Sequence, residues 1–111
     1  MTEPQAFKDY RQHTSFQPQS QTKVTLFRSD RLMLGLNCLD PGQRQSLHNH
    51  ADQDKFYLVL EGAGEFEVAD QRQTAGPGVV IWAAAGQPHS VVNTGDSGLV
   101  VLVGIAPAPG A

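Results

Sequence analysis

The segment that decides the fold runs from Gly42 to Gly62 and reads GQRQSLHNHADQDKFYLVLEG. It carries two histidines, His48 and His50, and then a short run of aromatic and aliphatic residues that ends at a glycine turn. Side chains at i and i+2 of a β-strand point to the same face, so these two imidazoles lie side by side if the segment is a strand. Imidazole nitrogen is a good ligand for Zn, Cu, Fe and Ni. The segment therefore predicts strands, one of which carries half of a metal site.

A second segment, from Gly78 to Asn93, reads GVVIWAAAGQPHSVVN and supplies a third histidine, His89. It consists of an apolar run, a turn with glycine and proline, and another short strand-like run. Histidines that converge from two strands leave coordination positions open for a substrate or for oxygen. The remaining histidine, His13, lies outside both segments, and we interpret it as solvated.

The two segments resemble the two motifs of the cupin family. In the first, the residues in motif register are Gly42, His48, His50, Lys55 and Gly62; in the second, they are Gly78, Ala84, Gly86, His89 and Asn93. The resemblance implies an all-β fold, a double-stranded β-helix or jelly-roll barrel of short antiparallel strands. It also implies a metal held by His48, His50 and His89, with Fe, Mn, Ni, Cu and Zn as the candidate ions.

Two positions depart from the family pattern. Ala84 stands where proline is usual, which changes only the rigidity of the turn. Lys55 stands where most metal-binding cupins have a glutamate ligand. A protonated lysine repels a cation and has no lone pair to offer, so the fourth ligand is missing or displaced.

Strand parity offers candidates for that fourth ligand. Gln53, Lys55 and Tyr57 share the face of His50, and a small bulge would bring the Gln53 carbonyl oxygen, or Asp54, to the metal. We favour Gln53 on parity alone. The contrary hypothesis is a site without metal, in which Lys55 replaces the metal's charge and binds an acidic ligand or pairs with a nearby carboxylate.

Composition predicts one domain with two appendages. The chain has 111 residues, with eleven glycines and seven prolines that lie mostly between short apolar runs, as in an all-β protein. We expect an extended arm over residues 1–22, the barrel over residues 23–106 and a tail over residues 107–111. The run 99–105 is apolar on both faces, which indicates a strand that is covered on both sides or lies at a subunit interface.

Charge and hydropathy exclude several partners. The formal net charge is −3 and no run of basic residues is present, which argues against nucleic acid. No apolar segment is long enough for a bilayer, and the N-terminus lacks a signal pattern, so we expect a soluble cytoplasmic protein. The single cysteine, Cys38, suits a reducing compartment and is expected to be a small buried residue.

Inward positions of such a barrel line its pocket. Parity places Tyr57 and Val59 there beside the histidines, and Leu36, Cys38 and Trp82 are expected as neighbours. We expect Asn93 to satisfy backbone groups in its turn.

Function stays open between three hypotheses. An enzyme would act on a small oxygenated metabolite with dioxygenase-, isomerase- or decarboxylase-like chemistry, with Lys55 or Tyr57 handling protons. A binding module would hold a small acidic or hydroxylated molecule in a pocket centred on Lys55, with or without metal. In a third hypothesis the metal mainly stabilises the barrel. The apolar run 99–105 and the arm also favour a homodimer.

Overall fold

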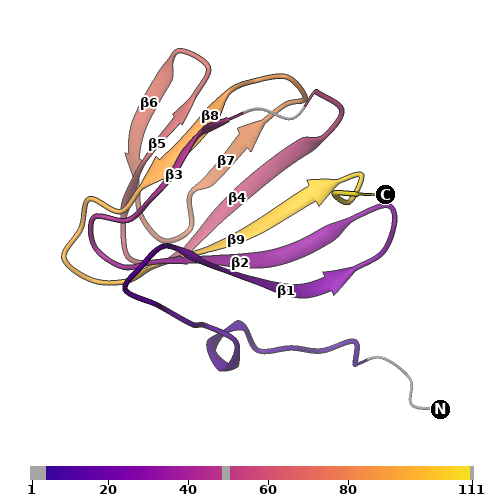
Figure 1. The fold of residues 1–111 in the computed structure, drawn as a ribbon, viewed down its shortest axis with the longest axis horizontal. Helices are drawn as coiled ribbons and strands as arrows, with labels where there is room; N and C mark the ends of the chain where they lie inside the picture. The colour runs from indigo at the N-terminus through magenta and orange to yellow at the C-terminus, as the bar shows by residue number, and fades with distance from the viewer. Residues whose placement is uncertain (1–4, 49–50, 111) are drawn as a thin grey trace.

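The computed structural model describes residues 5–48, with His48 by its backbone alone, and residues 51–110. In these residues the chain forms one short 3₁₀ helix, η1 (Tyr10–Gln12), and nine strands (Figure 1). The strands are β1 (Thr22–Arg28), β2 (Met33–Leu39), β3 (Arg44–His48), β4 (Asp54–Glu61), β5 (Gly64–Val68), β6 (Gln71–Ala75), β7 (Val80–Ala83), β8 (His89–Val92) and β9 (Leu99–Ala106). No helix in the described part of the chain is long and apolar enough to cross a bilayer.

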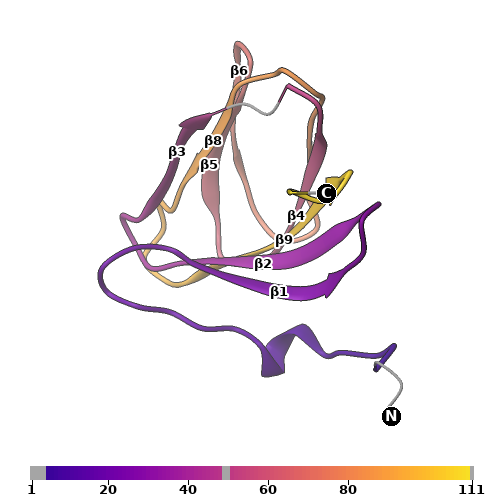
Figure 2. The same ribbon diagram turned by 45° about the vertical axis from the view of Figure 1, so that its right-hand side comes forward.

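The strands form two antiparallel sheets that face each other, as Figures 1 and 2 show. One sheet has the order β1-β2-β9-β4-β7 and the other β3-β8-β5-β6. The predicted jelly-roll barrel is therefore confirmed. Strand β6 was not predicted, because its first four residues, Gln71 to Thr74, are polar and exposed. It forms as an edge strand, paired with β5 across a turn at Ala69 and Asp70.

The main core lies between the two sheets. Strand β9 runs through the middle of the five-stranded sheet and is buried on both faces, as its continuous apolar sequence predicted. The buried residues of this cluster are Leu39, Tyr57, Val59, Phe66, Ala75, Val91, Leu99, Val101, Val103 and Ile105.

A second cluster covers the outer face of the five-stranded sheet. Leu36 and Cys38 belong to it, together with Leu26 and Val100, and Tyr10 of the N-terminal arm packs against it. Our expectation that Leu36 and Cys38 line the pocket was wrong, since their side chains leave β2 on the side away from the barrel interior. Cys38 is nevertheless fully buried, and this burial raises the pKa of its thiol.

Candidate functional site

A β-bulge sets the register of the two histidine-bearing strands. Gln45 pairs with Val91, and His48 pairs with His89. Two residues of β3 but only one residue of β8 lie between these pairs, so β3 contains one extra residue there. The extra residue reverses the alternation of faces after Gln45. Leu47 is accordingly 59% exposed, whereas Gln45 is buried. The bulge makes the backbones of His48 and His89 direct neighbours across the ladder.

His89 is the first residue of β8 and is 2% exposed. Its Nδ1 lies 2.9 Å from the carbonyl oxygen of Gln87. A carbonyl only accepts, so Nδ1 carries the hydrogen and the lone pair lies on Nε2. Metal-binding imidazoles are commonly held in this way, by a carbonyl that fixes the tautomer. The tautomer of His89 therefore suits a ligand role.

Lys55 lies on β4, in the sheet opposite the one that holds His89. Every second side chain of β4, at Lys55, Tyr57 and Val59, points into the barrel, as parity predicted. The Lys55 side chain is only 3% exposed, and its amine lies 4.9 Å from the centroid of the Tyr57 ring. No carboxylate of residues 5–48 and 51–110 is within ion-pair distance of this amine. Burial lowers the pKa of Lys55 to about 8, and the charge of Lys23 acts in the same direction.

Tyr57 connects the two sheets. Its hydroxyl donates a hydrogen bond of 2.7 Å to Oε1 of Gln45, and both residues are buried. Its ring lies 5.5 Å from Phe66 and 6.1 Å from His89, centroid to centroid. Burial raises the pKa of Tyr57 well above its ordinary value. Gln45 was not identified from the sequence; the only signal was a polar residue within a strand next to the histidine pair.

The candidates for a fourth ligand have other contacts in the structure. Gln53 donates from its side-chain nitrogen to the carbonyl of Pro107 at 3.1 Å. Asp54 accepts a hydrogen bond of 2.9 Å from the backbone nitrogen of Ala85. His50 lies outside the described residues. The structure thus brings Lys55, Tyr57 and His89 together, and the assignment of Gln53 as a ligand stays a prediction.

Among the described side chains no group of three or more His, Cys, Asp or Glu has a metal-binding arrangement. Two of the three motif histidines, His48 and His50, contribute no side chain to that set.

The turns that close the motifs explain two of the glycines. Gly62 has a φ of +79° and Gly86 a φ of +82°, a region that other residues seldom adopt. A β-carbon at Gly62 would also overlap the carbonyl oxygen of Gly98. Asn93, as predicted, satisfies backbone groups: its side-chain nitrogen donates to the carbonyls of Leu39 at 2.8 Å and Ser97 at 2.9 Å.

Trp82 does not line the barrel interior. It pairs with Phe56 on the outer side of β4 and β7 and is 56% exposed, so our expectation of a place inside the barrel was wrong. It lines instead, with Phe66 and Ile81, a groove of about 620 Å³. Parity within β7 instead turns Ile81 and Ala83 inward, beside Tyr57 and Lys55.

Residues 35–105 match the family model described as "Cupin domain". The chain belongs to the cupin family. The curated "Oxalate-binding protein" of Thermotoga maritima is 33% identical over 58% of this chain, and the chain spans about half the length of that relative, 53%. The crystal structure of TT1209 from Thermus thermophilus has 35% identity and a TM-score of 0.91, with 95% of this cupin and 100% of that chain covered. A predicted oxalate decarboxylase from Thermotoga maritima has 30% identity and a TM-score of 0.65, with 67% and 64% covered.

Proposed function

We propose that this cupin binds a small carboxylate-bearing metabolite inside the barrel, at a divalent transition metal held by His48, His50 and His89. The observation that carries the proposal is the buried amine of Lys55, which no carboxylate in the described part of the chain neutralises. A buried charge is costly unless it is paired, so this position favours an anionic ligand. Lys55 would pair with a ligand carboxylate, and the ring of Tyr57 would form the wall beside it.

The donor set fits such a metal. His89 presents Nε2 because Nδ1 is engaged with Gln87, and the register makes His48 its cross-strand neighbour. This backbone register supports His48 as the second ligand. Gln53 remains our candidate for the fourth. A bound transition metal would supply Lewis-acid chemistry to a ligand oxygen.

The chemistry of the relatives agrees with a small acid. Both matches from Thermotoga maritima are named for oxalate, the curated one as an oxalate-binding protein and the solved structure as a predicted oxalate decarboxylase. Oxalate is a compact dicarboxylate, with one group available for a metal and another for a cation such as Lys55. We therefore take oxalate as the first ligand to test.

A second candidate function is a metal-free binding module. It is favoured by Lys55 itself, because a cation occupies the motif position where most metal-binding cupins have a carboxylate ligand. In that case Lys55 alone would attract the acid, and chelation would leave ligand affinity unchanged.

The metal is tested by elemental mass spectrometry of the protein purified without an affinity tag. We expect near-stoichiometric Fe, Mn, Ni, Cu or Zn in the wild type and its loss in His48→Ala and His89→Ala, because each substitution removes an imidazole ligand. His13→Ala is the matched control, since His13 lies in the arm outside both motifs. Metal that is absent from the wild type, or equally present in all variants, would contradict the three-histidine site.

The ligand is tested by titration calorimetry with oxalate. We expect binding that weakens at least tenfold in Lys55→Met, since a charge-assisted contact contributes on the order of 1.5–3 kcal/mol. Lys8→Met is the control, because Lys8 belongs to the arm and donates to the carbonyl of Leu26. Unchanged affinity in Lys55→Met would contradict the role of the amine, and unchanged affinity after chelation would select the metal-free module.

A further inference from the structure

Strands β6 and β7 end the two sheets and flank one groove. In the described part of the chain β6 pairs with β5 alone and β7 with β4 alone (Figure 1). The other edge of each strand therefore presents backbone N–H and C=O groups that no strand satisfies. The groove between the two strands has a volume of about 620 Å³. Small-molecule sites have volumes of roughly 300–1,000 Å³.

The floor of this groove is apolar. Phe66 and Ala75 line it from the four-stranded sheet, and Val79 and Ile81 line it from the other side. All four residues belong to the main core or pack against it. Trp82 also lines the groove and is 56% exposed. The groove therefore offers aliphatic and aromatic surface to the apolar face of a ligand.

Two glutamines lie on the inner face of β6. Gln73 pairs with Phe66 and Gln71 pairs with Val68, so both glutamines lie on the same face of the sheet as Phe66. Inner positions of a packed sheet are normally apolar, yet both of these side chains are polar and exposed, and both line the groove. Neither side chain has a hydrogen bond to another described residue. Their amides are therefore available to a ligand.

Gln87 adds a third amide to the lining. Its Oε1 accepts a hydrogen bond of 2.9 Å from the backbone nitrogen of Ala84, so its side-chain nitrogen is the group that it offers to the groove. A side-chain amide has two donor hydrogens and an acceptor oxygen. Together with the strand edges, the three glutamines give the groove both donors and acceptors.

The groove offers no uncommitted charge. Arg72 is the one charged residue among the described residues that line it. The Arg72 guanidinium forms ion pairs with Glu65 at 3.3 Å and with Glu67 at 3.2 Å. These two carboxylates outnumber the cation, so the local charge does not favour an anion. Lys55 is not part of the lining, which separates this groove from the carboxylate site proposed above.

We propose that the groove between β6 and β7 is a second binding site, which takes a neutral sugar ring. The hydroxyl groups at the rim of a sugar both donate and accept hydrogen bonds, as the amides and the free strand edges do. The C–H face of the ring would pack on the apolar floor, beside Trp82. A neutral ligand also suits a groove whose only cation is already paired.

An extended peptide fits the same groove less well. A peptide would add to the free edge of β6 or β7, but β7 has only four residues and β6 carries the charged Arg72 on its exposed stretch. Short edge strands and charged side chains are the features by which proteins resist the addition of another strand. The polar inner face of β6 is explained by a hydroxylated ligand and not by a strand.

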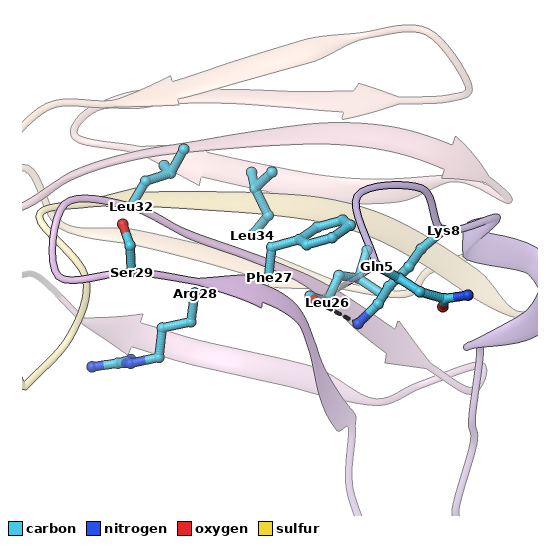
Figure 3. A pocket seen from close by; sticks show the side chains of 8 residues that line it. All are labelled: Gln5, Lys8, Leu26, Phe27, Arg28, Ser29, Leu32 and Leu34. Atoms are coloured by element: carbon cyan, nitrogen blue, oxygen red, sulfur yellow. Dashed lines mark hydrogen bonds between the residues drawn. The ribbon is translucent and has the colours of Figure 1, made fainter. Parts of the chain in front are cut away.

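A second groove, of about 550 Å³, lies where the arm crosses β1 and β2 (Figure 3). Both of its basic residues are engaged with backbone carbonyls: the amine of Lys8 donates to Leu26 at 2.7 Å, and the guanidinium of Arg28 donates to Pro109. Its remaining walls are mainly apolar, formed by Leu26, Phe27, Leu32 and Leu34. This groove has fewer polar groups to offer, so it serves as the comparison surface.

The first test is a nuclear magnetic resonance titration of the isotope-labelled full chain with glucose, galactose and mannose. We expect at least one of these sugars to shift the side-chain amide signals of Gln71 and Gln73, and the indole N–H signal of Trp82, until they saturate. Sorbitol is the matched control ligand, because it carries hydroxyl groups but no ring face, and it should leave these signals in place. No saturable shift with any of the three sugars, or an equal response to sorbitol, would overturn the proposal.

The second test removes the amides. We expect Gln71→Leu/Gln73→Leu to weaken binding of the sugar that gave the largest shift at least tenfold, because each lost hydrogen bond is worth roughly fivefold. Thr74→Val is the matched control, since Thr74 pairs with Glu65 on the opposite face of β6. Leu32→Ala is a control in the comparison groove. Unchanged affinity in the double variant, or an equal loss in either control, would show that the sugar does not bind between β6 and β7.

Discussion

Replacement of Lys55 by methionine is expected to stabilise the fold while it weakens ligand binding. The pKa of Lys55 falls from 10.5 to about 8 on folding, chiefly because burial penalises the charged amine. At 1.36 kcal/mol per pKa unit, this difference costs on the order of 3 kcal/mol at pH 7. Methionine is also long and unbranched and carries no charge, so it fills the same space without this penalty. Urea unfolding at pH 7, in the presence of a chelator, measures the gain.

The lowered pKa of Lys55 also determines how the stability of the wild type changes with pH. Between pH 8 and pH 10.5 the unfolded chain keeps the Lys55 proton while the folded chain has lost it, so stability rises with pH in this window. Below pH 8 the full penalty is present. We expect the stability of Lys55→Met to lack the increase between pH 8 and pH 10.5 that Lys55 causes in the wild type. A variant less stable than the wild type at pH 7 would contradict an unpaired buried amine.

An exchange of stability for binding is common at functional sites. In a barrel without a ligand, Lys55 only lowers the free energy of unfolding, because Tyr57 and Ile105 beside it belong to an apolar core. The cost is offset if a carboxylate enters the barrel and pairs with the amine. The stability measurement therefore tests the cost of the unpaired amine, and the oxalate titration tests the gain when a carboxylate pairs with it.

Local patterns predicted much of this molecule. Alternation in β4 placed Lys55, Tyr57 and Val59 inward, and the structure confirms all three positions. The motif spacing placed His48 and His89 on separate strands, which the ladder makes neighbours. These features depend on the two-residue alternation of side chains along a strand, which is visible in the sequence itself.

Features that depend on the partner of each strand were not predicted. The bulge after Gln45 is visible only once β3 is paired with β8, so neither its register nor the bond from Tyr57 to Gln45 follows from parity. Strand β6 has a polar sequence and forms because β5 offers it a partner.

Parity also leaves the choice of face undecided. It says which side chains of a strand share a face but does not say which face is the barrel interior. In β2 both faces are buried, because the arm covers the outer one, so nothing in the hydrophobic pattern distinguished Leu36 and Cys38 from their neighbours. For Trp82, an exposed aromatic residue on the edge strand β7 was placed in the barrel interior, whereas it lines a groove between β6 and β7.

The largest destabilisation is expected for Phe66→Ala. Phe66 is 3% exposed, and its ring lies against Tyr57 at a centroid distance of 5.5 Å. Truncation of a core phenylalanine to alanine costs about 3–5 kcal/mol, because the lost contacts leave a cavity that closes only in part. Thermal and urea unfolding of the variant measure this loss.

The position of Phe66 gives this variant a second consequence. Phe66 also lines a groove of about 620 Å³ between β6 and β7, while its ring packs against Tyr57. Its removal would admit water toward the site, and we expect weaker oxalate binding as well as lower stability. Phe16→Ala is the matched control, because Phe16 is 40% exposed and packs on Gly98 from the arm, and it should cost about 1 kcal/mol. Equal losses for the two variants would mean that Phe66 does not hold the two sheets together beside the site.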